Sequence, residues 1–395
     1  MPPSFPLSEP PRNTGHIRAL DGVRGAAVTM VFVYHALFFS MNGGTPAARL
    51  LIQLTGMGWA GVDVFFVLSG FLITTILLKQ RETQNYFRVF YARRLLRLSP
   101  LYYLVVAGAL LLMRGRYSHK VELLYWLNFS NFPTAFQPLS IPFLAHLWSL
   151  AIEEQFYLIW PAVVRFFRVR TVALLCGTVM VVLLCVRNFP SVLAMNAVYP
   201  EFVYRLTPFR LDTLCSGALL AILVKYRGQW MPSRRVLRIA FLAFAVLFVS
   251  TGGRYLRDVA VTRYGYTSLL LASCALVALC LEPASRTARF FSAKALTKLG
   301  QYSYAIYLFH PFVLRFGAAV LDRAYRPGPA QVVPNAARLA LLPLEFACTY
   351  GLAAVSWRLI EEPFLKKKSL FRYEPGIRAA SSTTIQPDAL SPGFG

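Results

Sequence analysis

Charged residues are scarce in this sequence, and acidic residues are the scarcest of them. Only 15% of the 395 residues are Asp, Glu, Lys or Arg, and 17 acidic residues stand against 41 basic ones. Hydrophobic residues make up 56% of the chain and aromatic residues 14%. A water-soluble domain of this length could not bury so much apolar surface. The composition therefore excludes a soluble globular protein and indicates a protein that lies in a lipid bilayer.

The sequence also lacks a disulfide framework and a cleavable signal peptide. Its six cysteines all fall in apolar segments, without a CxxC pair, so neither disulfides nor a cysteine metal site is expected. Residues 1–15 are Pro-rich, have no apolar core, and are predicted to be disordered. Residues 367–395 are predicted to form a basic and then disordered cytoplasmic tail. One transmembrane domain, 16–366, remains between them.

Long apolar runs recur along nearly the whole chain. A spanning helix needs about 20 predominantly apolar residues. The predicted spans are 19–40, 57–79, 98–113, 143–164, 171–187, 207–225, 236–251, 266–282, 301–321 and 338–358. The sequence thus predicts an all-α polytopic membrane protein of about ten transmembrane helices.

Basic residues gather at the ends of alternate spans. The segments 79–97, 165–170, 225–238, 286–298 and 366–368 are rich in Lys and Arg, whereas the intervening loops are poorer. The positive-inside rule then predicts that both termini are cytoplasmic. Topology and contact with anionic lipid explain the formal net charge of +24 better than nucleic acid does. We expect a multi-pass protein of the cell inner (cytoplasmic) membrane.

The first predicted span carries Arg24 near its cytoplasmic end and His35 eleven residues later. On an α-helix this separation places the two side chains about 20° apart around the axis and roughly 16 Å apart along it. A cation at the surface above a buried imidazole suits a long donor with an anionic head and an inward-reaching reactive end. The structural alternative is that Arg24 extends to lipid headgroups and His35 hydrogen-bonds to another helix.

The second predicted span, GVDVFFVLSGFLITTIL, contains Asp63 at its start and Ser69 beside Gly70 at its centre. Both polar residues are candidates for substrate or donor binding. Asp63 is as readily explained as a cap or as one half of an ion pair near the outer membrane surface. The Ser-Gly pair is also typical of close helix packing.

The segment YARRLLRLSP before the third span holds Arg93, Arg94 and Arg97. Arg93 and Arg97 are four residues apart and share one side of a helix. Closely spaced guanidinium groups can bind a phosphate-rich ligand. The alternative interpretation is a charge cluster that only sets topology.

The fourth span, HLWSLAIEEQFYLIW, places His146, Ser149 and Glu153 at positions i, i+3 and i+7, which form one helical stripe. Glu153 and Glu154 lie inside an apolar segment, where each carboxylate must find a proton or a cation. We therefore interpret this stripe as functional. Glu153, or as a second choice Glu154, would orient His35 as a base.

Two later features are explained at least as well by structure as by function. Arg210 and Asp212 in FRLDTLCSGALLA are expected to form an internal ion pair. His310, which precedes Pro311, is a lone histidine within its span. Such a residue is more often an interhelical hydrogen-bonding partner than a catalyst.

Taken in order, these segments resemble the acyltransferase-3 family of membrane acyltransferases. The motifs that carry the resemblance, from about residue 16 to 366, are IRALDGVRG with the later His35, GVDVFFVLSGFLIT, RRLLRLSPLYY, HLWSLAIEEQFYLIWP, FRLDTLCSGALLA, LGQYSYAIYLFHP and WRLIEEPF. One such motif would be weak evidence, whereas seven in register are strong.

The resemblance implies transfer of an acyl group, most often acetyl, from cytoplasmic acyl-CoA to a hydroxyl of a carbohydrate, lipid-linked sugar or secondary metabolite. Acyl-CoA would be the donor substrate, and no bound cofactor is expected. The family's essential Arg-x10-His pattern maps onto Arg24 and His35, and its Arg-rich motif onto Arg93 and Arg97. Family members that acetylate glycans often add an SGNH hydrolase-like domain. This sequence ends at residue 395 without one, so acceptors that need it are less expected.

The mechanism expected from sequence has two parts. Arg24, Arg93 and Arg97 would hold the nucleotide end of acyl-CoA. His35, positioned by Glu153, would act as general base on the acceptor hydroxyl, or would itself accept the acyl group first. The rival is a transporter or flippase that uses His and Glu as a proton relay. Against the rival, the sequence shows no inverted repeat and no paired broken helices.

Overall fold

The structure is a computed structural model. It describes residues 17–38, 40–136, 140–226, 232–251, 258–282, 284–325 and 333–375. Within these ranges the regular structure is helical throughout, without a strand, which confirms the predicted all-α class. The predicted N-terminal segment 1–15 lies outside the described residues, and the predicted tail 367–395 is described only to residue 375.

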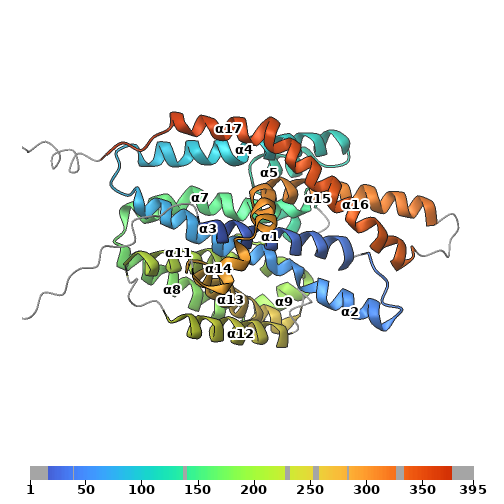
Figure 1. Ribbon diagram of the computed structural model, residues 1–395, viewed down its shortest axis with the longest axis horizontal. Helices are drawn as coiled ribbons and strands as arrows, with labels where there is room; N and C mark the ends of the chain where they lie inside the picture. Colours follow the sequence, from blue (N-terminus) through green and yellow to red (C-terminus); the bar gives the residue numbers. More distant parts are fainter. Residues whose placement is uncertain are drawn as a thin grey trace, which may run out of the picture.

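The long helices of the described residues, those of 15 residues or more, form the body of the molecule, arranged as in Figure 1. They are α1 (Arg18–Val33), α3 (Ala60–Lys79), α4 (Tyr86–Leu112), α7 (Trp148–Phe166), α8 (Val169–Val186), α11 (Leu211–Tyr226), α12 (Arg234–Ser250), α13 (Tyr266–Cys280), α15 (Lys294–Tyr325) and α16 (Asn335–Ser356). Each of the ten predicted spans overlaps one of these helices.

Shorter elements connect the long helices. The short α-helices are α2 (Pro46–Thr55), α5 (His119–Trp126), α6 (Asn131–Ala135), α9 (Pro190–Val198), α10 (Phe202–Arg205), α14 (Arg286–Phe291) and α17 (Glu362–Lys366). The π-helical turns are η1 (Tyr34–Phe38), η6 (Val261–Gly265) and η7 (Trp357–Glu361). The 3₁₀ turns are η2 (Gly56–Trp59), η3 (Ala145–Leu147), η4 (Thr207–Arg210) and η8 (Lys367–Leu370).

Seven helical segments in the described ranges are long and apolar enough to cross a membrane. They are Pro46–Lys79, Tyr86–Leu112, Val169–Val186, Thr207–Tyr226, Val261–Cys280, Lys294–Tyr325 and Asn335–Leu370. The protein is therefore a multi-pass membrane protein. The total of ten spans and the cytoplasmic position of both termini stay predictions.

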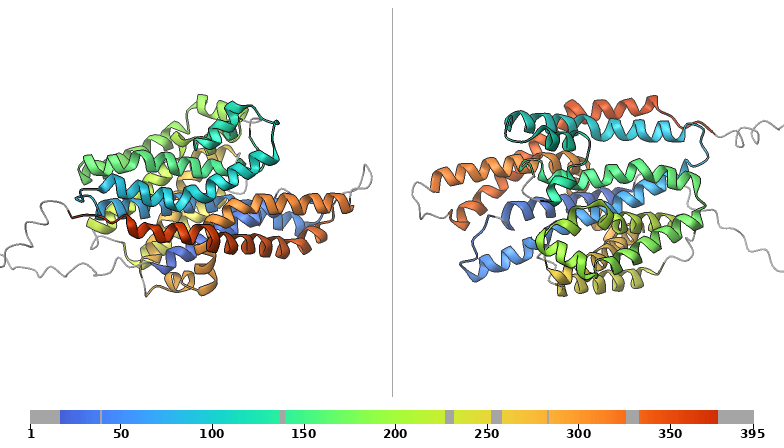
Figure 2. Two further views of the ribbon diagram at one scale, coloured as in Figure 1. Left: turned by 90° about the horizontal axis from the view of Figure 1, so that it is seen from above. Right: turned by 180° about the vertical axis from the view of Figure 1, so that it is seen from behind.

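The long helices run side by side, with α1 and α3 inside the bundle (Figure 1). At one end, α2 and the hairpin of α15 and α16 extend beyond the other helices, as the views in Figure 2 also show. The two central contacts of the bundle join α1 to α15 and α3 to α11. These contacts set the positions of the polar residues described below.

Glycines bring the central helices close together. Gly70 of α3 lies against the carbonyl of Leu214 in α11, and Gly217 of α11 lies against the carbonyl of Val67 in α3. Gly25 packs α1 against the backbone of α15 in the same way. A Cβ atom at any of these positions would overlap with backbone, so only glycine permits this spacing. Gly70 of the Ser-Gly motif in the second predicted span thus has the role in close helix packing that the sequence analysis gave as the alternative to ligand binding.

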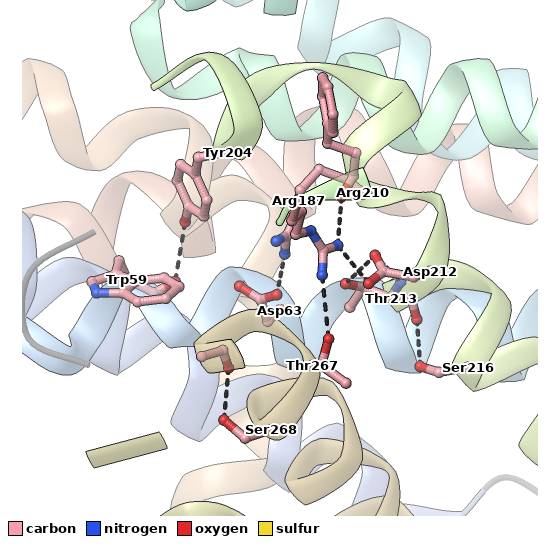
Figure 3. Close-up of polar contacts among 12 residues, drawn as sticks. Trp59, Asp63, Arg187, Tyr204, Arg210, Asp212, Thr213, Ser216, Thr267 and Ser268 are labelled. Carbon is pink, nitrogen blue, oxygen red and sulfur yellow. Dashed lines mark hydrogen bonds and ion pairs between the residues drawn. The ribbon is translucent and has the colours of Figure 1, made fainter. Parts of the chain in front are cut away.

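Two buried arginine–aspartate pairs join α3 and the end of α8 to the start of α11 (Figure 3). Arg210, from η4, pairs with Asp63 of α3. Arg187, which follows α8, donates to Asp212 Oδ2 at 2.5 Å. All four side chains are fully buried. The expected pair of Arg210 with Asp212 is wrong, because residues two apart point to different sides of a helical turn.

Aromatic rings complete the surroundings of Arg210. Its guanidinium lies over the rings of Phe66, Tyr204 and Tyr266, at 5.7, 5.4 and 4.8 Å from the ring centroids. Cation–π contacts of this kind stabilise a charge that is removed from water. Asp63 is therefore held in a closed structural network. Of its two expected roles, donor binding or one half of an ion pair, the structure shows the ion pair.

Candidate active site

A cavity of about 890 Å³ lies between α1, α3, α4, α7, α11 and α15. Ile17, Lys79 and Lys225, which line one end of it, are exposed, so the cavity reaches the surface there. Lys79 and Lys225 belong to the loops predicted to be cytoplasmic. The opposite end, lined by Ser149 and Tyr307, is buried in the bundle. The volume falls within the roughly 300–1,000 Å³ that is usual for ligand and cofactor sites.

Positive charge dominates the cavity wall. Seven charged residues line the cavity, five basic and two acidic: Arg24, Lys79, Arg94, Arg97 and Lys225, with Asp21 and Glu153. Five minus two leaves a surplus of three positive charges. The Nε of Arg24 is buried and has no hydrogen-bonding partner among the described residues. A buried guanidinium with an unused donor is well suited to bind an anionic group.

The structure places the two arginines of the expected α4 pair in different surroundings. Arg93 donates from Nε to the carbonyl of Phe371 at 2.8 Å and lies 5.2 Å from the ring of Tyr373, so it holds the C-terminal segment. Burial raises the pKa of the Tyr373 phenol, which therefore stays neutral beside Arg93. Arg94 and Arg97 line the cavity instead. Arg94 and Arg97 are three residues apart, so both can face the cavity, whereas Arg93 is held away from it by its contacts with the C-terminal segment.

Glu153 belongs to a hydrogen-bonded group on the cavity wall. Ser69 donates to Glu153 Oε1 at 2.8 Å, and the hydroxyl of Tyr157 lies 3.0 Å from both Glu153 Oε2 and Ser69 Oγ. Arg24 is an electrostatic neighbour of the carboxylate. Arg24, Ser69 and Glu153 were candidates from three different motifs, and the fold brings them together on one wall of the cavity. Glu154 faces a separate pocket of about 40 Å³.

Two hydroxyl groups close the inner end of the cavity. The oxygens of Ser149 and Tyr307 are 2.7 Å apart, and the Tyr307 hydroxyl donates to the carbonyl of His146 at 2.8 Å. The ring of Tyr307 contacts the imidazoles of His146 and His310, with centroid separations of 5.2 and 5.6 Å. The space that begins at the cationic mouth therefore ends directly in front of two histidines.

Three histidines meet behind Tyr307. His35 from η1, His146 from η3 and His310 from α15 lie in contact, with centroids 5.0 Å apart for His35 and His310 and 5.3 Å apart for His146 and His310. His310 Nε2 is 3.1 Å from His35 Nδ1. Neither ring nitrogen of His146 has a hydrogen-bonding partner in the described ranges. No group of three or more His, Cys, Asp or Glu there is placed to hold a metal ion.

The structure gives His35 and Glu153 hydrogen bonds to different residues. The His35 ring hydrogen-bonds His310 and the backbone of Val31, while Glu153 hydrogen-bonds Ser69 and Tyr157. His310 therefore makes the interhelical hydrogen bond expected of it. A signal for the histidine cluster was present in the sequence, since three of only five histidines fall inside predicted spans. Nothing in one sequence showed that they meet.

His35 lies where its helix departs from α-helical geometry. The residues Tyr34–Phe38 form a π-helical turn, a feature that often occurs at functional sites. Arg338 of α16 donates from Nε to the carbonyl of Ala36 in this turn at 2.9 Å. Its other nitrogens bind both carboxylate oxygens of Glu345 at 2.8 and 2.6 Å. A buried ion pair thus holds the turn that presents His35.

The fold and the site together define a helical multi-pass membrane protein with a cationic cavity that ends at a histidine cluster. The sequence profile of the acyltransferase-3 family, described as an acyltransferase domain, matches residues 17–357. The chain therefore belongs to the acyltransferase-3 family of membrane acyltransferases.

Curated relatives carry related names. The chain is 31% identical to "Peptidoglycan O-acetyltransferase OatA" of Listeria monocytogenes, over 92% of this chain and 58% of that protein. It is 29% identical to "O-acetyltransferase OatA" of Staphylococcus aureus strain MRSA252, over 94% of this chain and 61% of that protein. The chain thus spans about three fifths of the length of these relatives. No solved structure gives a significant match.

Proposed function

We propose that this protein is a membrane O-acyltransferase that moves an acyl group, expected to be acetyl, from cytoplasmic acyl-CoA to a hydroxyl of a glycan acceptor. The observation that carries the proposal is the cavity, which joins a cationic mouth to hydroxyl groups beside buried imidazoles. Family membership supports acyl transfer. The names of the relatives support acetyl as the group and a glycan as the acceptor.

The cationic part of the cavity would bind the nucleotide end of the donor. Arg24, Arg94 and Arg97 present guanidinium groups to the same space, and phosphates accept paired hydrogen bonds from guanidinium. This set replaces the Arg24, Arg93 and Arg97 expected from sequence. The pantetheine arm would then follow the apolar wall, which includes Phe65, toward Ser149 and Tyr307.

His35 would act at the inner end as the general base. It would take the proton of the acceptor hydroxyl while that oxygen attacks the thioester carbonyl. The C–S bond breaks and CoA leaves as thiol after the thiolate takes up a proton. An acyl-His35 intermediate is the alternative order of events. Because Tyr307 lies between the cavity and the histidines, transfer requires its hydrogen bond with Ser149 to open.

The test uses the purified full chain in proteoliposomes with acetyl-CoA and fragments of peptidoglycan glycan as acceptor. We expect acceptor-dependent release of free CoA thiol and an acetylated glycan. His35→Ala should reduce transfer by about 10²–10⁴-fold, the usual contribution of a general base, while CoA binding persists. His119→Ala is the matched control, since His119 is fully exposed.

Two results would overturn the proposal. The first is unimpaired transfer by His35→Ala in protein that is correctly folded and inserted. The second is the absence of thiol release with any hydroxyl acceptor, because a transporter or flippase would consume no thioester. Arg24→Ala should weaken CoA binding, and unchanged affinity would remove the donor-binding part alone.

A further inference from the structure

The π-helical turn η1 contains a buried carbonyl, that of Ala36, which is bound by side chains. In an α-helix or a π-helix this carbonyl would accept from the amide of Ser40 or of Met41. Both amides donate to the carbonyl of Leu37 instead, at 3.2 and 3.1 Å. The Ala36 carbonyl accepts from the Ser40 hydroxyl and from Arg338 Nε, the latter at 2.9 Å. Because a buried carbonyl without a donor is costly, the turn depends on these side chains.

Glu345 fixes the direction in which Arg338 donates. Both residues belong to α16, and each is only 3% exposed. Arg338 Nη1 and Nη2 donate to the two carboxylate oxygens of Glu345 at 2.8 and 2.6 Å. This forked pair sets the plane of the guanidinium and therefore the direction of its Nε–H. A lysine ammonium is a flexible point charge without such a fixed third donor.

The same helix also holds the chain before and after the turn. Asn335 Oδ1 accepts from the backbone N–H of Asn42 at 2.8 Å, and Asn335 Nδ2 donates to the Asn42 carbonyl at 2.7 Å. Asn335 and Arg338 are three residues apart and so share one side of α16. Further along α16, the ring of Phe346 meets the ring of Phe32 in α1, with centroids 5.1 Å apart. Helix α16 thus contacts the segment that carries η1 at three successive places.

His35 lies in this turn, directly before Ala36. Its ring is hydrogen-bonded to His310 and to the backbone of Val31. These bonds orient the imidazole, whereas Arg338 holds the backbone that carries it. A π-helical turn closes over one residue more than an α-helical turn. Relaxation to α-helical geometry would therefore rotate His35 relative to the rest of α1, by up to about 100° for one residue.

We propose that Arg338 is a positioning residue. Its Nε–H, fixed by Glu345, holds the π-helical turn and so keeps His35 beside His310 at the inner end of the cavity. The inference rests on the proposed function, in which His35 is the base. The helix that follows the long α15 hairpin would thus control the efficiency of transfer without contacting either substrate.

Two variants reverse the order of stability and activity. Arg338→Met combined with Glu345→Leu removes the bond to Ala36 and leaves no unpaired charge in the protein interior. Glu345→Gln keeps that bond but leaves the arginine without its opposite charge. If the pair were merely structural, the less stable Glu345→Gln would be the less active. The proposal predicts the lower activity for the double variant, although it is the more stable of the two.

Activity is measured with the full chain in proteoliposomes with acetyl-CoA and glycan fragments, and thermal unfolding shows whether each variant is folded. We expect the kcat of the double variant to fall about 10–100-fold, as for other orienting partners. The KM for acetyl-CoA should not change, because the arginines of the cavity are untouched. Arg234→Met with Glu282→Leu is the matched control. It makes the same change at an ion pair that is about half exposed and should leave kcat unchanged.

A second readout is independent of activity. Hydrogen–deuterium exchange of the full chain in lipid nanodiscs, followed by mass spectrometry, reports on the amides of Ser40, Met41 and Asn42. They should exchange faster in the double variant and in Arg338→Lys than in the unmodified protein or the control. Arg338→Lys keeps a charge beside Glu345, so it decides the outcome if the double variant does not fold.

An unchanged kcat in the folded double variant would overturn the inference, and so would unchanged exchange of the turn in both Arg338 variants. Faster exchange combined with full transfer by His35→Ala would have a different meaning. It would refute the proposed function and leave intact the conclusion that Arg338 holds the turn.

Discussion

Two regions of the bundle hold arginines and acids inside apolar surroundings, and they use them differently. In the ion-pair network, Asp63 with Arg210 and Asp212 with Arg187, each charge has an opposite partner and no side chain reaches solvent. In the cavity, five basic residues face two acidic ones across open space. The first region is neutral and closed, and the second is positive and open.

The difference shows that a buried charge indicates function only when its partners are known. The Asp63–Arg210 pair holds α3 to the start of α11, at a place where glycines already bring these helices together. Arg24 and Glu153 also lie near each other, but both face the cavity. Surplus charge beside a cavity, rather than charge inside a membrane span, is the feature that predicts an anionic ligand.

The largest effect is expected from breaking the closed network. Asp63→Ala leaves Arg210 buried without its partner, and loss of one half of a buried pair costs about 3–5 kcal/mol. Thermal unfolding in detergent micelles, followed by intrinsic fluorescence, should show a clearly lower midpoint. Asp63→Leu combined with Arg210→Met should recover much of that loss, because no unpaired charge remains. A midpoint for Asp63→Ala equal to that of the unmodified protein would show that the network is not structural.

A smaller effect is expected from the open region, on donor binding rather than on stability. Arg97→Ala should remove a charge-assisted hydrogen bond of about 1.5–3 kcal/mol, which weakens CoA binding about tenfold or more. Arg93→Ala is the matched control from the same helix and should change the affinity far less. Isothermal titration with CoA measures both variants. Equal losses for the two would contradict the assignment of Arg93 to the C-terminal segment.

The smallest effect, a response to salt, compares the two regions within one protein. Raising NaCl from about 0.1 M to about 1 M shortens the Debye length from about 10 Å to about 3 Å. CoA binding at the solvent-reached mouth should weaken several-fold, while the unfolding midpoint should change little, because buried pairs are screened much less. Salt-independent CoA binding would place the donor phosphates away from the lysines and arginines of the mouth.

The fold was predictable from the sequence to the level of its helices. Each predicted span overlaps a long helix because an apolar run is a local property of the chain. The contacts between helices were only partly predictable. The Ser-Gly motif indicated close packing at Gly70, but its partner Gly217 lies almost 150 residues further along the chain. The π-helical turn that carries His35 had no sequence signal, because the buried Arg338 that binds it comes from α16.

The sequence predicted which residues line the site better than it predicted which of them contact each other. Arg24, Arg97, Ser69, Ser149 and Glu153 were candidates, and all five line one cavity. Helical spacing showed which arginines of α4 can share one side of the helix. It could not show which of them face the cavity, because that depends on where the C-terminal segment packs. Likewise, the stripe on α7 indicated a functional acid, whereas His310, which hydrogen-bonds His35, came from a helix far along the chain.

A structure of the full chain with bound CoA, determined by electron cryomicroscopy in lipid nanodiscs, tests the central claim most directly. The account predicts CoA phosphates within hydrogen-bonding distance of Arg24, Arg94 and Arg97, and the thiol beside Ser149 and Tyr307. A thiol left at the mouth, or CoA bound outside this cavity, would contradict it.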